Sequence, residues 1–373
     1  MKNDEKVVKP VGLVKFSLID PEDTFELPSY EESDSRGKSM ISWGPDNRFP
    51  NNLFEMSQNS PTLSSIINGT IELIKGEKIE INPDIHANQD LYYYPFMNRN
   101  DETLTDLVEQ LIRDYMLYGT FAIQVIYNKL DKKAELVALP AEYIRMNEDR
   151  TVIYFCKKWR KFSTNAIMYD KFDDSNIVNH ESQVFVYTNS GNRQVYGISP
   201  QNAALEDIAA EAFAGKYIRK SLQSGLSARF LVDLPNTANL TDDQKAELEE
   251  GITDRFCGWQ NSGSFALYFN NGDKPMNITK VDMDESSKVF NEIRAAARTN
   301  IFITNHATPN LFGDPNATTG FNSQEYDDAY NLYNKMTLTP IKNAIAKSFN
   351  KIFKMNDAIT FGDKNNSLNN DGE

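Results

Sequence analysis

Two long helical segments that bracket a smaller insert constrain this chain more than any other feature of its sequence. Residues 202–224 predict a helix of about 22 residues, or roughly 33 Å. Acidic residues lie in its first half and basic residues in its second, the order that complements the helix dipole, and Gly225 follows it. Residues 286–304 predict the second helix, and 226–284 predict an insert of strands around one capped helix. An ordinary well-capped surface helix has the same charge order, so that interpretation stays open.

The chain before this helix pair predicts a mixed α+β unit. Apolar residues recur at helical spacing over 63–74 and 104–116, and Gly119 follows the second segment where a C-terminal cap glycine belongs. Segments rich in β-branched and aromatic residues predict antiparallel strands at 120–127, 135–139, 151–155 and 183–188. Residues 60–198 are therefore expected to fold as one unit of helices and antiparallel strands.

A loop and a long helix are predicted after the helix pair. Residues 308–320 contain two prolines, two glycines and two consecutive threonines, which favour a loop. Residues 323–353 predict one helix, and Pro340 is expected to kink it near Met336 by removing a backbone hydrogen bond. One face of this helix carries three tyrosines: Tyr326, Tyr330 and Tyr333.

Composition limits the classes of function. The chain has 373 residues and a net charge of −14, so tight static binding of DNA phosphates is not expected, whereas DNA that slides past the protein is compatible with it. No apolar run is long enough to predict a membrane span, and the charged N-terminus lacks the apolar segment of a signal peptide. Cys156 and Cys257 are far apart, which predicts neither a zinc site nor a disulfide framework. We expect an extended arm over 1–40 and a polar tail at the C-terminal end.

No arrangement of residues predicts a catalytic site. Nucleotide-binding, serine-hydrolase and zinc-protease motifs are absent from the sequence. The histidines are isolated in three different contexts: His86, His180 and His306. The acidic group Asp282, Asp284 and Glu285 fits the start of a metal-dependent nuclease site, but it also fits the cap of the helix that follows. The aromatic run 92–94 suits base stacking or, more commonly, a buried or interface cluster.

Several segments, in this order, resemble the portal proteins of tailed bacteriophages. They are 118–127 (YGTFAIQVIY), 136–140 (LVALP), 144–146 (IRM), 196–200 (YGISP), 224–232 (SGLSARFLV), 263–269 (GSFALYF), 301–313 (IFITNHATPNLFG), 321–325 (FNSQE) and 337–341 (TLTPI). No one segment is specific, but their order over residues 40–355 is. The stretch 301–313 departs from the family pattern because it is less apolar before its proline.

The resemblance implies an α+β portal fold with a mixed wing, two stem helices, a small α/β clip and a long kinked spine helix. The implied divisions are an arm at 1–40, a wing at 41–200, a stem helix at 201–225, a clip at 226–284, a second stem helix at 285–307, a tunnel loop at 308–321, the spine helix at 322–355 and a polar tail at 356–373. A crown domain is expected to be minimal or absent.

The resemblance also implies a structural protein without enzymatic activity or cofactor. It is expected to form a homo-oligomeric ring, dodecameric in the family, at one capsid vertex of a virion assembled in the cytoplasm of an infected bacterium. Expected partners are double-stranded DNA, the terminase large subunit, the major capsid protein and a head-completion or adaptor protein, with no membrane.

Within that ring the resemblance and the residue types together suggest two groups of site residues. The tunnel loop is expected to meet DNA through Asn310, Asn316, Thr318 and Thr319. The stem helices are expected to contact the channel or a neighbouring subunit through Lys216, Arg219, Lys220, Arg294 and Arg298. A nuclease or a minor capsid protein is the alternative.

Overall fold

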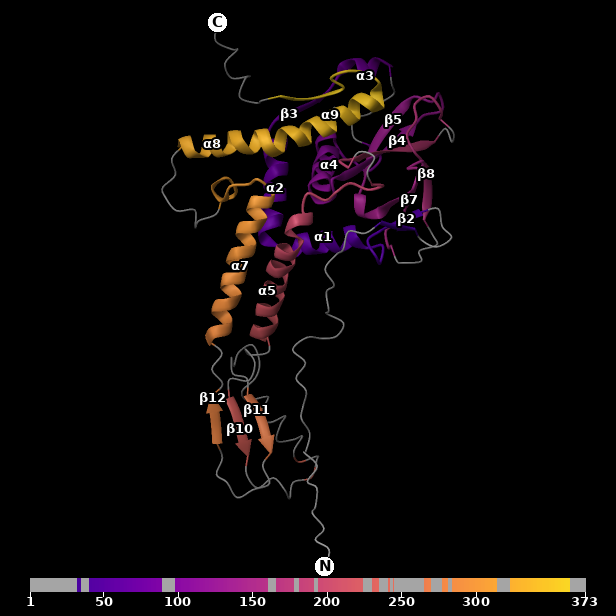
Figure 1. Cartoon of the computed structure of the whole chain (residues 1–373). Coiled ribbons are helices and arrows are strands. Elements are labelled where there is room, and N and C mark those ends of the chain that lie inside the picture. Colours follow the sequence, from indigo (N-terminus) through magenta and orange to yellow (C-terminus); the bar gives the residue numbers. More distant parts are fainter. Residues whose placement is uncertain are drawn as a thin grey trace, which may run out of the picture.

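The computed structural model describes most of the chain and shows a mixed body that carries a long helix pair (Figure 1). The described residues are 32–34, 40–88, 98–159, 166–177, 181–190, 194–223, 230–234, 241, 244, 265–269, 277–280, 284–313 and 323–362. Helices and antiparallel strands alternate through the body, which confirms the α+β class. Among these residues no helix is long and apolar enough to span a membrane.

The core of the body forms around three helices, α1 (Phe49–Asn59), α2 (Pro61–Lys75) and α4 (Leu104–Tyr118). The apolar positions that predicted α2 and α4 are buried together in one hydrophobic cluster. Each buried aliphatic side chain contributes roughly 1.5–3 kcal/mol to folding, so this cluster determines how the helices pack.

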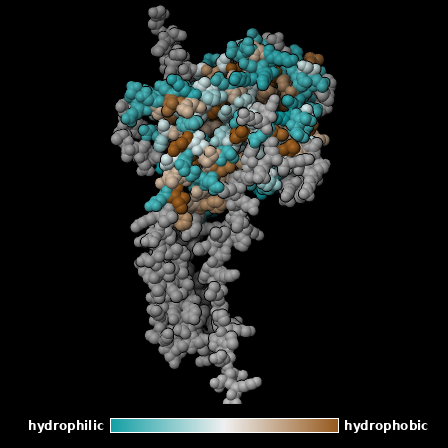
Figure 2. Space-filling view, viewed as in Figure 1, coloured by the Kyte–Doolittle hydropathy of each residue, from teal (hydrophilic) through white to brown (hydrophobic). Residues whose placement is uncertain are grey.

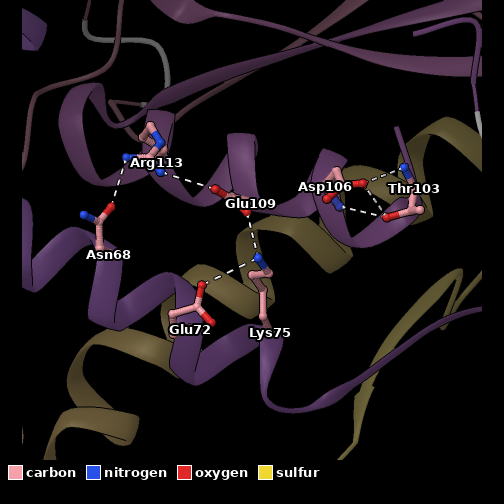
Figure 3. Close-up of polar contacts among 7 residues, drawn as sticks. All are labelled: Asn68, Glu72, Lys75, Thr103, Asp106, Glu109 and Arg113. Carbon is pink, nitrogen blue, oxygen red and sulfur yellow. Dashed lines mark hydrogen bonds and ion pairs between the residues drawn. The ribbon is translucent and has the colours of Figure 1, made fainter. Parts of the chain in front are cut away.

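Local sequence signals set the ends of these helices. Thr103 and Asp106 form a capping box at the start of α4, with Thr103 N–H donating to the Asp106 carboxylate at 2.9 Å (Figure 3). Gly119 ends α4 in the left-handed conformation, with φ at 61°, and donates its N–H to the Tyr115 carbonyl at 2.8 Å. This conformation confirms the predicted C-terminal glycine cap. Lys75 of α2 also forms an ion pair with Glu109 of α4 at 2.9 Å, which joins the two helices (Figure 3).

Two antiparallel sheets complete the body. The first has the strand order β1-β2-β6-β7-β8 and the second β5-β4-β9. The strands of the first are β1 (Glu32–Asp34), β2 (Met40–Trp43), β6 (Ile144–Asn147), β7 (Val152–Phe155) and β8 (Ile167–Asp170). Those of the second are β4 (Thr120–Tyr127), β5 (Lys133–Leu139) and β9 (Ser182–Thr188). The four strands predicted in this region are confirmed to within two residues at each end.

A fully buried arginine joins the first sheet to the turn before α1. Arg145 of β6 donates from Nε to Asn47 Oδ1 and from Nη2 to the Asn47 carbonyl, both at 2.6 Å, and from Nη1 to the Ile144 carbonyl at 2.6 Å. Its guanidinium lies 4.9 Å from the ring centre of Trp159 and 5.8 Å from that of Trp43. Burial lowers the pKa of Arg145 to about 10, so the side chain is still charged at neutral pH.

Two smaller sheets accompany these, one packed into the core of the body and one beyond the helix pair. Strand β3 (Lys78–Ile81), which precedes α3 (Pro83–Asn88), pairs antiparallel with β13 (Ile359–Gly362). Ile359 is buried in the hydrophobic core. The expectation of a polar tail over 356–373 is therefore wrong for its first part, because Ala358 and Ile359 carry enough apolar surface to extend a sheet. Beyond the helix pair, β10 (Phe230–Leu234) pairs parallel with β11 (Phe265–Phe269) and antiparallel with β12 (Asn277–Lys280).

The predicted long helix is two helices in one continuous rod. Helix α8 (Ser323–Tyr333) is followed by a π-helical turn, Asn334–Leu338, and then by α9 (Thr339–Phe353). Pro340 occupies the start of α9, where its missing N–H needs no partner. The predicted kink near Met336 stays a prediction; what the structure shows at that position is the π-helical turn, whose wider backbone accommodates the proline ring.

Buried carboxylates give the body a testable pH dependence. Burial and the nearby Glu142 raise the pKa of Asp114 well above its usual value, although the Ala141 N–H donates to Asp114 Oδ2 at 2.9 Å. The folded chain therefore holds this proton more tightly than the unfolded chain, whose carboxyl has a pKa of about 3.9. Protonated Asp114 therefore adds to the free energy of unfolding below about pH 4. This contribution is lost as the pH rises through the pKa that Asp114 has in the folded chain.

Replacing Asp114 with asparagine is expected to raise the free energy of unfolding at pH 8 more than at pH 5, because the neutral amide accepts the same hydrogen bond. Urea unfolding at the two pH values measures this. Asp106→Asn is the control of opposite sign, since hydrogen bonds from Thr103 lower the pKa of Asp106 and its loss should destabilise the protein at pH 8. An equal change in the free energy of unfolding of Asp114→Asn at both pH values would contradict a raised pKa for Asp114.

Candidate functional site

The helix pair is the part of the molecule that differs most from an ordinary packed domain. Helix α5 (Leu205–Gln223) leaves the body and α7 (Asp284–Thr304) returns to it, and the two run antiparallel and side by side (Figure 1). The short turn Asn202–Ala204 precedes α5 as a 3-10 helix, so the helix predicted over 202–224 is confirmed with a tighter first turn. We call α5 and α7 together the hairpin.

A reciprocal amide pair joins the two helices where they meet the body. Gln201 Nε2 donates to Asn305 Oδ1 at 2.7 Å, and Asn305 Nδ2 donates to Gln201 Oε1 at 3.1 Å. Gln201 also donates to the Met116 carbonyl at the end of α4, at 3.0 Å. Both amides are buried, where an unpaired polar group would cost about 1–3 kcal/mol, so the pair fixes the base of the hairpin.

A buried carboxylate provides the second attachment. Glu211 of α5 accepts a hydrogen bond from Thr62 Oγ1 at 2.6 Å, another from the Thr62 N–H at 3.3 Å, and a third from Ser60 Oγ. Ser60 is the N-cap of α2, so the negative charge lies at the positive end of that helix dipole. The sequence indicated only that Glu211 belonged to an acidic half-helix. Its role as a tether depends on residues about 150 positions earlier in the chain.

The basic residues expected on the hairpin occupy different environments. Lys216 forms a loose ion pair with Glu55 at 3.8 Å, and Arg219 is exposed. Such exposed pairs contribute little to stability, about 0–1 kcal/mol. Arg294 and Arg298 line a groove of about 470 Å³ between α7, α5 and the start of α2, together with Glu211 and Phe302. The side chain of Lys220 lies outside the described residues.

Apolar side chains on the hairpin divide into buried and exposed ones. Ile208 is 0% exposed and belongs to the core of the body, whereas Ile293 is 41% and Ile303 65% exposed on α7. Phe213 on α5 is also exposed. Figure 2 shows hydrophobic surface at the described end of the hairpin. Ile208 therefore supports the subunit itself, and α7 provides the apolar surface that another molecule can cover.

The predicted loop begins with an ordered turn. Residues Pro309–Phe312 form a short 3-10 helix within the segment predicted as a loop. Phe312 contacts Tyr333 edge-on with ring centres 5.3 Å apart, and it lies so close to Gly69 of α2 that a Cβ there would be 2.7 Å from the ring. This aromatic contact keeps the turn on the body. Asn310 is exposed on it, and Asn316, Thr318 and Thr319 lie outside the described residues.

Among the described residues, no groups suited to catalysis or metal binding are brought together. Across the described ranges no three His, Cys, Asp or Glu side chains are arranged to hold a metal ion. His306 is exposed at the end of α7, and Asp284 is the first residue of that helix. The side chain of His86, and all of His180, Cys257, Asp282 and the aromatic run 92–94, lie outside what the structure describes.

Comparison with known families gives a match over most of the chain. A profile of the family described as phage portal protein matches residues 83–368, well over half of the chain. The chain belongs to the phage portal protein family. That family is structural, which supports a portal protein without enzymatic activity. No match to this portal protein was found among curated proteins.

Solved structures share the fold of this portal protein at low sequence identity. A chain of the virion of a native gene transfer agent particle has a TM-score of 0.53 and 16% identity, with 83% of each chain covered. A chain from the neck of that native particle, computed with C12 symmetry, has a TM-score of 0.50 and 15% identity over 84% of each chain. An HK97 family phage portal protein from Corynebacterium diphtheriae has a TM-score of 0.52 and 12% identity, covering 84% of this chain and 97% of the other.

Proposed function

We propose that this portal protein forms a ring at one vertex of a virus capsid, with the hairpin of each subunit beside the central channel. The observation that carries the proposal is the hairpin itself, two antiparallel helices held to the body by Glu211 and by the amide pair of Gln201 and Asn305. Exposed Ile293 and Ile303 on α7 give a neighbouring subunit an apolar surface to cover. The C12 symmetry of the similar neck supports a dodecamer.

The divisions of the chain follow from this assignment. We propose that 41–200 is the wing, 201–225 and 285–307 are the stem helices, 226–284 is the clip and 308–321 is the tunnel loop. The rod over 322–355 is then the spine, and 1–40 is an arm, whose residues Glu32–Asp34 pair with β2. The small sheet of β10, β11 and β12 at the far end of the hairpin supports the clip (Figure 1).

The proposed function implies a set of partners and a location. Double-stranded DNA would pass through the channel in packaging and ejection, and the net charge of −14 would repel its phosphates on average, so that DNA slides and is not held. Lys216, Arg219, Lys220, Arg294 and Arg298 would supply local contacts to DNA or between subunits. The terminase large subunit and a head-completion protein would dock on the clip, and the major capsid protein would surround the wing. The ring would assemble in the bacterial cytoplasm and remain in the virion.

Negative-stain electron microscopy and sedimentation velocity of the purified full chain test the proposal. The expected result is a ring with a central hole that sediments as a species of about twelve subunits. A compact monomer at every protein concentration would overturn the proposal.

The tunnel loop gives a separate prediction about DNA. Removing 317–319 is expected to leave rings intact, because surface loops tolerate shortening, and to reduce packaging or retention of DNA. The neutral side chains Asn310, Asn316, Thr318 and Thr319 would offer DNA hydrogen bonds weak enough to break and re-form. An in vitro packaging assay measures the effect, with parent rings as the reference. Equal packaging by the shortened ring would remove the loop from translocation and leave the ring assignment standing.

A further inference from the structure

The spine rod divides its charge between its two ends. Its 31 residues, Ser323 to Phe353, span about 46 Å. Helix α8 contains Glu325, Asp327 and Asp328 and no basic residue, whereas α9 contains Lys342, Lys347 and Lys351 and no acidic residue. Lys335 lies in the π-helical turn between them. The rod therefore has one acidic and one basic end.

On the basic end, two lysines are used within the subunit and two are not. Lys342 pairs with Glu77 at 2.7 Å, and Lys354, just after α9, pairs with Asp174 at 3.0 Å. Lys347 and Lys351 lie one helical turn apart and are exposed, and neither forms an ion pair with any residue that the structure describes. Two neighbouring positive charges thus remain available on the surface of α9.

The acidic end of the rod is exposed in the single subunit. Residues 324–328 are all exposed, and their three carboxylates form no ion pair within the described part of the chain. The tyrosine face of α8 is buried only at its inner end: Tyr333 is 1% exposed, with its hydroxyl 2.6 Å from Thr70 Oγ1, whereas Tyr326 is 41% exposed. Figure 1 shows α8 reaching beyond α2 and α7.

Helix α8 has 11 residues, and a helix that short gains most of its stability from packing. The exposed outer half of α8 would therefore be stabilised by packing against another surface. We propose that, in the assembled ring, the acidic end of α8 docks on Lys347 and Lys351 of α9 in the next copy of the chain. The inference rests on the proposed ring and adds a contact that the hairpin does not provide. A head-to-tail contact of this kind uses two different, complementary patches of one subunit and closes when the ring is complete. Opposite charges at the two patches also set the direction of docking.

Charge reversal tests the contact in the full chain. The acid-reversed variant carries Glu325→Lys, Asp327→Lys and Asp328→Lys, and the base-reversed variant carries Lys347→Glu and Lys351→Glu. Each alone brings like charges together, so the protein concentration for half-maximal ring assembly should rise about tenfold in low salt. Mixing the two variants in equal amounts should restore assembly to within about twofold of the parent, because every acid-reversed end then meets a base-reversed neighbour.

Restoration by mixing separates this contact from a folding defect, since two misfolded subunits do not repair each other. Glu148→Lys with Asp149→Lys, at two exposed acids in the β6–β7 turn, is the matched control and should assemble as the parent does. Sedimentation velocity measures the parent, the two reversed variants, their mixture and the control. The contact would be overturned if both reversed variants assemble as the parent does, or if mixing them does not restore assembly. The proposed function would still stand in either case, provided that the parent forms rings. Absence of rings from the parent itself would overturn both.

Discussion

Rings are expected to disappear when Ile293 and Ile303 on α7 are both replaced by aspartate. The two side chains are 41% and 65% exposed in the single subunit, so the substitution leaves its core unchanged. In the ring each would place an unpaired charge in an apolar contact, at a cost of several kcal/mol. With about 2 kcal/mol at each site, the protein concentration needed for assembly rises about 1000-fold. Sedimentation velocity over a concentration series measures the change.

Two other substitutions serve as controls for this experiment. Leu130→Asp, at an exposed apolar residue in the turn between β4 and β5, is the matched control and should leave rings intact. Ile208→Asp should unfold the subunit, since Ile208 is fully buried in the core. Unchanged rings in the double Ile293 and Ile303 variant would show that α7 does not contribute its apolar surface to the interface.

Replacing Arg145 with methionine is expected to lower the free energy of unfolding by about 3–5 kcal/mol. Methionine fills much of the space between Trp43 and Trp159 but donates no hydrogen bond, so the carbonyls of Asn47 and Ile144 lose partners while buried. A domain is stable by about 5–15 kcal/mol, so the loss would be a large part of the total. Urea unfolding followed by tryptophan fluorescence measures it, because two of the three tryptophans stack on this guanidinium.

The matched control for this prediction is Arg48→Met. Arg48 is exposed, and its side chain makes no cap hydrogen bond at the start of α1. Its replacement should change the free energy of unfolding by less than about 0.5 kcal/mol. Equal unfolding midpoints for Arg145→Met and Arg48→Met would mean that the buried hydrogen bonds of Arg145 are not needed.

Elements with strong local signals could be predicted well from the sequence. Helix α4 has a capping box, an apolar face and a C-terminal glycine, and all three act within a few residues of one another. Strands β4 and β9 are rich in β-branched and aromatic residues; β4 is buried on both faces along most of its length, and β9 is buried or half-buried throughout. Their ends were predicted to within two residues because burial and propensity favour the same conformation.

Features that depend on distant partners could not be predicted. Strand β13 pairs with β3, nearly 280 residues earlier, and nothing in the sequence near Ile359 distinguishes it from a tail. The turn at Pro309–Phe312 is held by Phe312 against Gly69, a contact that requires α2 to be in place. In both cases packing overrides a local preference for irregular structure.

The sequence by itself determined the order of the elements and, through it, the family. Hydrophobic periodicity, caps and proline act locally, so the helix pair, the insert and the interrupted rod can be recognised before any packing is known. Only the tertiary structure decided which side chains serve the subunit and which remain for a neighbour. Ile208 and Ile293 are chemically identical and both lie on hairpin helices, yet one is in the core and the other on the surface. Burial depends on where a helix face meets the rest of the fold, which no local pattern encodes.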